Sequence, residues 1–293
     1  MEVVLAGASG LIGSALASAL RNEGHRVKQL VRRPSGAPDT DTWDPAAGLL
    51  DPDFLAGADA VVCLSGATVG RRWTESYKRK IESSRVDTVG TIARHLAEYG
   101  GPRVFVAASA VGYYGDTGER EVDESTPPGD SFLAGVCRRW EAAADPARAA
   151  GVRVVHLRSG LVLARRGGLL KPLSLLTKAG LGGRLGNGRQ FMPWISLTDE
   201  VRAIRFALDS DVDGPVNLCA PSPVRNAEFT KTLGRVLHRP TVVPVPAFAA
   251  RLALGELAGE VLGGQRAVPR RLIESGFEFR HAELETALRG ELG

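Results

Sequence analysis

The sequence has little cysteine and no clustered metal ligands. The three cysteines, Cys63, Cys137 and Cys219, are far apart, odd in number and without C-x-x-C spacing. The five histidines are scattered and form no H-x-x-x-H or H-x-x-E-H pattern. These absences argue against a disulfide framework and against a metal site. Cys63 and Cys219 lie in apolar runs, so we expect them to be small core residues.

Long runs of one residue type are also missing. No uninterrupted apolar run approaches the ~18 residues of a membrane span, and no run of lysine and arginine is long enough to form a nucleic-acid surface. The net charge of +4 is spread along 293 residues, of which 44% are hydrophobic. We therefore expect a globular protein with neither a membrane nor a nucleic-acid partner. A glycine motif begins almost at residue 1, which leaves no room for a signal peptide and favours the cytoplasm.

This glycine motif is the most informative feature of the chain. The apolar run Val3–Leu5 predicts a buried strand, and apolar residues at helical spacing over 11–20 predict a helix. Glycine lets the intervening turn approach a pyrophosphate, and the helix N-terminus offers free N–H groups to the anion. Strand, turn and helix together favour a dinucleotide site over a glycine-rich turn that binds nothing. The predicted cofactor contacts in this turn are Gly7, Ser9, Gly10, Leu11, Ile12 and Gly13.

The end of the second predicted strand, His25–Val31, indicates which dinucleotide binds. An NAD-binding chain often has an acid there, ~20 residues past the glycines, to bond the ribose 2′-hydroxyl. Here Arg32 and Arg33 follow the strand, and the first acid is Asp39. Two guanidinium groups can bind a 2′-phosphate through charge-assisted hydrogen bonds, although a basic pair can also be merely solvated. We predict NADP rather than NAD.

Strand and helix signals alternate along the first half of the chain. Further buried strands are expected at 59–64, 103–108 and 152–157, and helical stretches at 75–98 and 132–150. This alternation predicts an α/β fold, a Rossmann-like doubly wound parallel sheet with helices on both faces.

Past about residue 161 the pattern changes. The stretch 180–190 holds five glycines, too many for regular structure. We expect Trp194 in the core and Asp199 at the start of a helix. The chain is accordingly divided into an NADP-binding domain, residues 1–165, to which parts of 195–220 return, and a smaller C-terminal substrate lobe, residues 166–293.

Ligands of such folds gather at the carboxyl ends of the strands. The loop after the strand at 103–108 carries three hydroxyls that could hold a substrate oxygen or pass a proton in a carbonyl–alcohol redox reaction. We predict catalytic roles for these residues, with packing in the core as the alternative for both tyrosines: Ser109, Tyr113 and Tyr114. Residues after two other strands are predicted to contact the cofactor: Leu64, Ser65, Gly66 and Arg158.

Five segments together resemble the short-chain dehydrogenase/reductase superfamily: GASGLIG, SAVGYYGD, FLAGVCRRWE, LRSGLVL and PWISLTDE. More narrowly, they are similar to its atypical, extended group of nucleoside-diphosphate-sugar epimerase-like proteins. The C-terminal segment of that group is similar to Phe248–Leu288 here. The resemblance covers essentially the whole chain, and it implies a Rossmann domain, a small substrate lobe and a bound dinucleotide.

One element of that superfamily is missing. Its proton relay is a Tyr-x-x-x-Lys pair on the helix after the serine loop, in which the lysine lowers the tyrosine pKa and holds the ribose. No such pair exists in this chain, and the expected positions fall on Leu133 and Cys137 or on Phe132 and Val136. Glu141 is expected to be a structural hydrogen-bonding group. Several arginines are available to replace the missing groups: Arg71, Arg72, Arg85 and Arg158.

Two functions from different classes fit these features. The first is an NADP-dependent oxidoreductase or epimerase-like enzyme acting on a small, sugar-like or anionic substrate. The second, motivated by the missing pair, is a non-catalytic NADP(H)-binding sensor or scaffold. A nucleotide-sugar binder without a nicotinamide role is a weaker alternative. A homodimer is the candidate assembly, and the sequence does not specify the substrate.

Overall fold

A computed structural model describes residues 1–293. Seven parallel strands form its central sheet in the order β11-β7-β5-β4-β1-β2-β3. The chain order reverses between β1 and β4, which is the arrangement of a doubly wound fold, and ligands of such folds bind at this point. The predicted fold class is confirmed. The strands are β1 Glu2–Ala6, β2 Arg26–Val31, β3 Thr40–Thr42, β4 Ala60–Cys63, β5 Val104–Ala110, β7 Arg153–Ser159 and β11 Gly214–Leu218.

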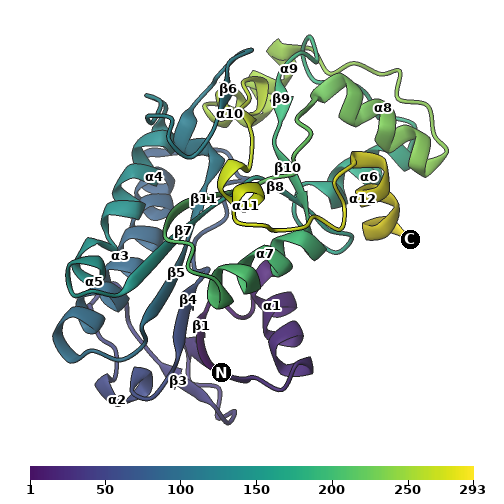
Figure 1. The fold of residues 1–293 in the computed structure, drawn as a ribbon. Helices are drawn as coiled ribbons and strands as arrows, with labels where there is room; N and C mark the ends of the chain where they lie inside the picture. Colours follow the sequence, from purple (N-terminus) through teal and green to yellow (C-terminus); the bar gives the residue numbers. More distant parts are fainter.

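Helices cover both faces of the sheet (Figure 1). One face carries α1 (Leu11–Asn22) and α7 (Leu197–Asp209), which bury residues such as Leu16 and Ile204 against the strands. The other face carries α3 (Glu75–Tyr99), α4 (Phe132–Ala142) and α5 (Asp145–Ala149), and the short helix α2 (Pro52–Leu55) adds Leu55 to the same core. The central strands β1 and β4 are therefore buried on both sides, which explains their continuous apolar sequences.

The helix expected over 132–150 is divided in two. Helix α4 ends at Ala142, and α5 begins at Asp145 with Pro146 in its first turn. A proline lacks the N–H that a continuous helix requires, whereas it is well tolerated in the first turn of a new one. The single long helix was therefore a wrong prediction, and Pro146 is the sequence signal for the break.

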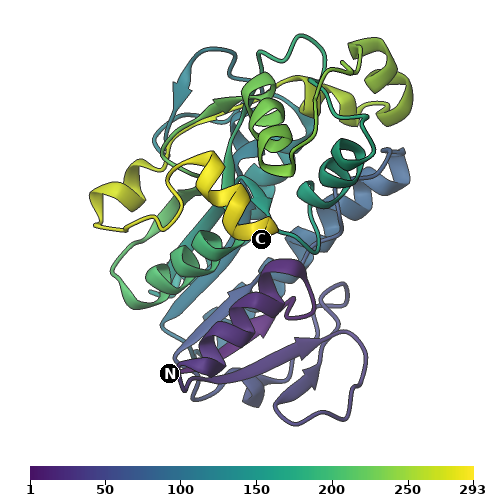
Figure 2. The ribbon, with the colours of Figure 1, turned by 90° about the vertical axis from the view of Figure 1, so that its right-hand side faces the viewer.

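Short elements form a C-terminal lobe beyond the carboxyl edge of the sheet (Figures 1 and 2). The lobe has its own core, which includes Trp194 and Phe229. The segment 195–220 leaves it to supply α7 and β11 to the main sheet. The remaining elements are β6 Glu121–Val122, β8 Leu161–Leu163, α6 Leu170–Lys178, β9 Phe191–Met192, β10 Trp194–Ser196, β12 Val224–Arg225, α8 Asn226–Leu237, α9 Ala247–Leu254, α10 Leu257–Leu262, β13 Arg266–Ala267, α11 Arg270–Glu274 and α12 Leu284–Leu292, with a 3₁₀ turn at Val111–Tyr114.

All three cysteines lie in the interior of the protein. Cys63, Cys137 and Cys219 are all buried and unpaired, and the first and last pack in the core as expected. None of the helices combines the length and the apolar character that a bilayer crossing requires.

A buried carboxylate joins the C-terminal segment to the start of α7. Asp199 is fully buried and accepts hydrogen bonds from the backbone amides of Arg280, at 2.9 Å, and His281, at 2.8 Å. Its own amide is capped by the Ser196 hydroxyl at 3.0 Å. Asp199 thus lies in the first turn of the helix, as predicted, and also holds a segment that follows 81 residues later in the chain.

Replacing Asp199 with alanine should leave the backbone amides of Arg280 and His281 without their acceptor. We expect Asp199→Ala to lower the free energy of unfolding by about 3 kcal/mol, since each hydrogen bond to a charged group contributes about 1.5–3 kcal/mol. Urea denaturation measures this change. The control is Asp209→Ala, which removes a largely exposed carboxylate from the same helix. Equal unfolding midpoints for the two variants would contradict the assignment.

Candidate functional site

The glycine turn is held in backbone contact with the end of β4. Gly7 has a φ of +89°, and a Cβ there would lie 2.8 Å from the carbonyl carbon of Leu64. A Cβ on Gly13 would lie 2.2 Å from the Gly7 carbonyl oxygen. Both distances are too short for any side chain, so only glycine permits this approach. The turn and the residues after β4, predicted to share the cofactor, therefore lie side by side at the switch point of the sheet.

The N-terminus of α1 carries unpaired hydrogen-bond donors. Its N-cap is Gly10, which offers no side-chain oxygen, and the first turn holds no acid. The backbone amides of Leu11, Ile12 and Gly13 donate to no group of the protein. Ser9 and Gly10 are exposed, so these donors can be reached from solvent. Free amides at the positive end of a helix dipole are suited to a phosphate group.

Two unpaired guanidinium groups stand at the end of the neighbouring strand. Strand β2 pairs with β1 in the sheet, which places Arg32 and Arg33 at the same edge as the glycine turn. Both side chains are exposed and form no ion pair or hydrogen bond within the protein. Asp39, the first acid after them, pairs instead with Arg26 at the opposite end of β2, at 2.6 Å. The residues present therefore fit a dinucleotide that carries a 2′-phosphate.

Polar side chains after β5 and β7 form a buried network. The Ser109 hydroxyl donates to Glu141 Oε1 at 2.6 Å. Arg158 donates to both Glu141 oxygens at 2.8 Å and to the Tyr114 hydroxyl at 3.0 Å. The Tyr114 hydroxyl in turn donates to Asn217 Oδ1 at 2.7 Å. Glu141 is thus the structural hydrogen-bonding group that the sequence suggested.

This network engages two of the predicted site residues, Arg158 and Tyr114. Arg158 is 3% exposed and uses its guanidinium on Glu141 and Tyr114, so it is not available to a cofactor. Tyr114 is 1% exposed, and burial raises the pKa of its hydroxyl despite the neighbouring Arg158 charge. The geometry therefore favours packing in the core, the alternative role for Tyr114, over proton transfer to a substrate.

The same network narrows the role predicted for Ser109. Its hydroxyl proton is committed to Glu141, so its oxygen can only accept a further hydrogen bond. Burial raises the pKa of Glu141, but the hydrogen bonds and charge of Arg158 outweigh this effect and the net pKa lies below the ordinary value. Glu141 is therefore ionised at neutral pH and keeps Ser109 oriented.

Tyr113 differs from its neighbour. Its side chain is half-buried, and its hydroxyl has no hydrogen-bond partner in the protein. The Arg158 guanidinium lies 3.5 Å from the centre of the Tyr113 ring, which fixes the ring by a cation–π contact. Of the three predicted catalytic residues, Tyr113 is the one whose hydroxyl proton remains free.

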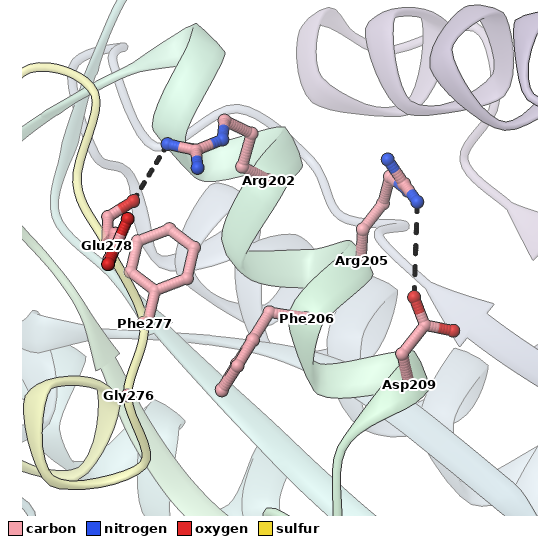
Figure 3. A pocket seen from close by; sticks show the side chains of 7 residues that line it. All are labelled: Arg202, Arg205, Phe206, Asp209, Gly276, Phe277 and Glu278. Atoms are coloured by element: carbon pink, nitrogen blue, oxygen red, sulfur yellow. Dashed lines mark hydrogen bonds and ion pairs between the residues drawn. The ribbon is translucent and has the colours of Figure 1, made fainter.

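Two of the cavities in the protein surface lie on different parts of the molecule. The larger, of about 420 Å³, is lined by loops that follow β4 and β5 and by α10 of the C-terminal lobe, including Trp73, Phe132 and Glu260. The other, of about 360 Å³, lies between α7 and residues 276–278 (Figure 3). There Arg205 pairs with Glu23, just past the end of α1. Because α1 begins at the glycine turn, this second cavity lies at the opposite edge of the sheet. None of the predicted site residues lines either cavity.

Comparisons with known proteins agree with this geometry. The model of the NAD dependent epimerase/dehydratase family matches residues 3–219, and a domain of unknown function matches residues 245–290. An epimerase family protein of Mycobacterium leprae is 47% identical, over 98% of this chain and 94% of its own. This chain belongs to the NAD-dependent epimerase/dehydratase family. The resemblance that the motifs indicated is confirmed.

Solved structures of family members are also similar. The crystal structure of human epimerase family protein SDR39U1 with NADPH has 35% identity and a TM-score of 0.90, covering 100% of this chain and 99% of its own. A nucleoside-diphosphate sugar epimerase from Corynebacterium glutamicum has 36% identity and a TM-score of 0.84, and this chain spans 58% of its length. The human protein was therefore crystallised with the reduced form of the cofactor predicted from Arg32 and Arg33.

The structure distinguishes the two pairs of positions at which the sequence places the missing Tyr-x-x-x-Lys relay. Leu133 packs 3.5 Å from the position of a Gly112 Cβ, and the Cys137 thiol contacts the Ala110 carbonyl oxygen at 3.7 Å. These two residues, rather than Phe132 and Val136, face the loop after β5. Burial, together with the charge of Glu141, raises the pKa of Cys137 to about 12, so its thiol is not an activated nucleophile.

A second buried carboxyl lies at the end of β7, where sequence reasoning missed it. Glu200 is fully buried and accepts a hydrogen bond from the Ser159 hydroxyl at 2.6 Å. Its other oxygen has no partner. Burial raises the pKa of Glu200 to about 8, against the opposing effect of Ser159. Its position in the first turn of α7 gives no sign of this, because most acids there are exposed.

Glu200 predicts a specific pH dependence of stability. Its pKa is higher in the folded than in the unfolded chain, so its contribution is most favourable below the unfolded value of about 4.5 and is lost as the pH rises towards about 8. The side chain in Glu200→Gln is neutral at every pH in this range, so it makes no pH-dependent contribution. Thermal unfolding should therefore show the Tm of Glu200→Gln rising relative to wild type between these two pH values. The control Glu274→Gln changes an exposed acid, and a constant wild-type-to-Glu200→Gln difference would refute the assignment.

Proposed function

We propose that this chain binds NADP(H) at the glycine turn. The free amides of Leu11–Gly13 would donate hydrogen bonds to the diphosphate, and Arg32 and Arg33 would bind the 2′-phosphate. The observation that carries this proposal is the coincidence, at one edge of the sheet, of unpaired helix amides and two unpaired guanidinium groups. The NADPH in the structure of the human relative supports it.

The proposed activity is that of an NADP-dependent oxidoreductase or epimerase-like enzyme. When bound, the nicotinamide supplies or accepts a hydride. Tyr113 is the candidate proton donor, because its hydroxyl alone among the loop hydroxyls keeps a free proton. Ser109 would accept a hydrogen bond from a substrate hydroxyl while Glu141 holds it in place. The cavity beside Trp73 and Phe132 would admit a small, sugar-like or anionic substrate.

Removing the two arginines tests the cofactor assignment. Each charge-assisted hydrogen bond to a phosphate is worth about 1.5–3 kcal/mol, so replacing Arg32 and Arg33 with alanine should weaken NADPH binding by about tenfold or more. Binding of NADH should hardly change, since it lacks the 2′-phosphate. Fluorescence titration with both dinucleotides measures the two constants. The control is Arg21→Ala, which removes an arginine from the far end of α1. An unchanged preference for NADPH would overturn the role of the pair.

A second function is favoured by one observation. The positions of the usual proton relay hold Leu133 and Cys137, packed against the loop after β5. A protein that kept the cofactor site and lost this relay would act as an NADP(H)-binding sensor or scaffold. It would bind the dinucleotide and change conformation without redox turnover.

Tyr113→Phe separates the two functions. If Tyr113 donates the proton, NADPH oxidation against a panel of small carbonyl compounds should fall by about 10²–10⁴-fold, the range for a lost general acid. The NADPH dissociation constant should stay unchanged, because the phenyl ring is retained. Equal turnover in both proteins would remove Tyr113 from the mechanism. Tight NADPH binding without turnover in the wild type would establish the sensor.

A further inference from the structure

The cavity of about 420 Å³ beside Trp73 has an acidic lining. Three of the residues that line it are acids, Asp116, Glu256 and Glu260, and none of them is basic. Three others are glycines, whose lack of side chains leaves the space open. This lining contrasts with the net charge of +4 of the whole chain. Negative groups around a binding space repel anions and attract cations, so the lining favours a cationic ligand.

Neighbouring cations do not neutralise this lining. Lys78 donates to Glu256 at 3.0 Å, but it also pairs with Glu75 at 2.7 Å, so one ammonium group serves two acids. Arg72, next to Trp73 in the chain, donates to the Leu252 carbonyl oxygen at 3.4 Å and pairs with no acid. The other two acids of the lining form no ion pair. The cavity therefore keeps an uncompensated negative charge.

These two acids, Asp116 and Glu260, also repel each other. Burial raises the pKa of Glu260, hydrogen bonds from the N-terminus of α4 lower it, and the negative charge of Asp116 raises it again. Asp116 uses only Oδ1 for its hydrogen bonds, which come from two backbone amides, and this leaves Oδ2 free. A cation bound between like charges relieves their repulsion.

Gln265 adds an unused acceptor to the same cavity. It is 8% exposed and lines the space. Its amide nitrogen donates to the Gly115 carbonyl oxygen at 2.9 Å, and this bond fixes the orientation of the amide because a carbonyl group only accepts. The side-chain oxygen is left without a hydrogen-bond partner in the protein. A nearly buried acceptor is expected to meet a donor, and the cavity is the space in which a ligand can supply one.

Two aromatic rings complete the lining. Trp73 and Phe132 pack edge to face, with 5.1 Å between the ring centres. An ammonium group over the face of such a ring is attracted by it, most strongly by tryptophan. The Lys78 ammonium already lies 5.5 Å from the centre of the Phe132 ring while it bonds to Glu256. The edge of the cavity thus already holds one ammonium group between a carboxylate and a ring.

We propose that this cavity binds the ammonium group of a small, amine-bearing substrate. The inference rests on the proposed NADP(H)-dependent function and narrows its substrate class to molecules of sugar-like size that carry an amine, rather than an anion. An ammonium group has three N–H donors, and Asp116, Glu260 and Gln265 supply acceptors for them. Asp116 follows Tyr113 by three residues in the loop after β5, which connects the cavity to the candidate proton donor.

The experiment titrates the protein with ethylammonium chloride at constant ionic strength. Nitrogen-15 NMR follows the indole N–H of Trp73 and the side-chain amide of Gln265, because both residues line the cavity. Ethanol is the neutral match of the probe, and magnesium chloride tests for a simple cation site. We expect both signals to shift saturably with ethylammonium and to stay in place with ethanol and magnesium. An equal response to magnesium, or no saturable response to ethylammonium, would overturn the proposal.

Two variants test which acids hold the ammonium group. Glu260→Gln removes a charge and keeps an acceptor for the N-terminus of α4, and Asp116→Asn does the same for the two backbone amides. Each should weaken ethylammonium binding by about tenfold or more, the value of one charge-assisted hydrogen bond. The control Glu274→Gln removes an exposed acid outside the cavity and should bind like the wild type. Because the Asp116 side chain is exposed, its variant should fold even if Glu260→Gln does not. Unchanged affinity in Asp116→Asn contradicts the assignment.

Turnover separates this proposal from the function on which it rests. Aminoacetone should have a lower KM than hydroxyacetone, which carries a hydroxyl in place of the amine, and Glu260→Gln should remove the difference. Equal KM values in a wild type that oxidises NADPH would overturn the substrate assignment and leave the proposed enzyme in place. If the wild type binds no NADPH or shows no turnover, the proposed activity fails, and the ethylammonium titration still decides whether the cavity binds an amine.

Discussion

The close approach of the glycine turn to the end of β4 is the constraint on which the site depends. The contacts of Gly7 with Leu64 and of Gly13 with Gly7 bring α1 down onto the sheet at the point where strand order reverses. That approach aims the unpaired amides of α1 at the carboxyl edge. It also puts the ends of β2 and β4, with Arg32, Arg33 and Gly66, around the same space. A side chain at either glycine would move the helix and separate these parts.

A second constraint, electrostatic rather than steric, shapes the loop after β5. Burying either charge alone would cost desolvation free energy. The bidentate ion pair between Arg158 and Glu141 offsets this cost for both side chains. The pair then decides what the neighbouring hydroxyls can do. Glu141 accepts a hydrogen bond from the Ser109 hydroxyl, and Arg158 donates one to the buried Tyr114 hydroxyl and packs on the ring of Tyr113. The superfamily uses a lysine to lower the pKa of a tyrosine. In this chain the buried Arg158 guanidinium packs on the ring of Tyr113.

The sequence predicted the parts of the molecule that are encoded locally. Strand, glycine turn and helix follow one another within the first 22 residues, and the arginines after β2 stand next to their strand. The network after β5 was not predictable in the same way. Ser109 meets Glu141 across 32 residues and Tyr114 meets Asn217 across 103. No spacing rule connects such partners. The sequence therefore predicted a cofactor contact for Arg158 and a catalytic role for Tyr114, and it gave no sign that the two side chains bond to each other in the core.

The most direct test of the account observes the amides of Leu11, Ile12 and Gly13 by nitrogen-15 NMR or hydrogen exchange while NADPH is added. The account predicts that these three amides, unpaired in the free protein, shift and become protected as the dinucleotide binds. It also predicts that the amides of Arg21 and Asn22, at the far end of α1, remain as they were. Saturating NADPH that leaves Leu11–Gly13 unchanged would contradict the account at its foundation.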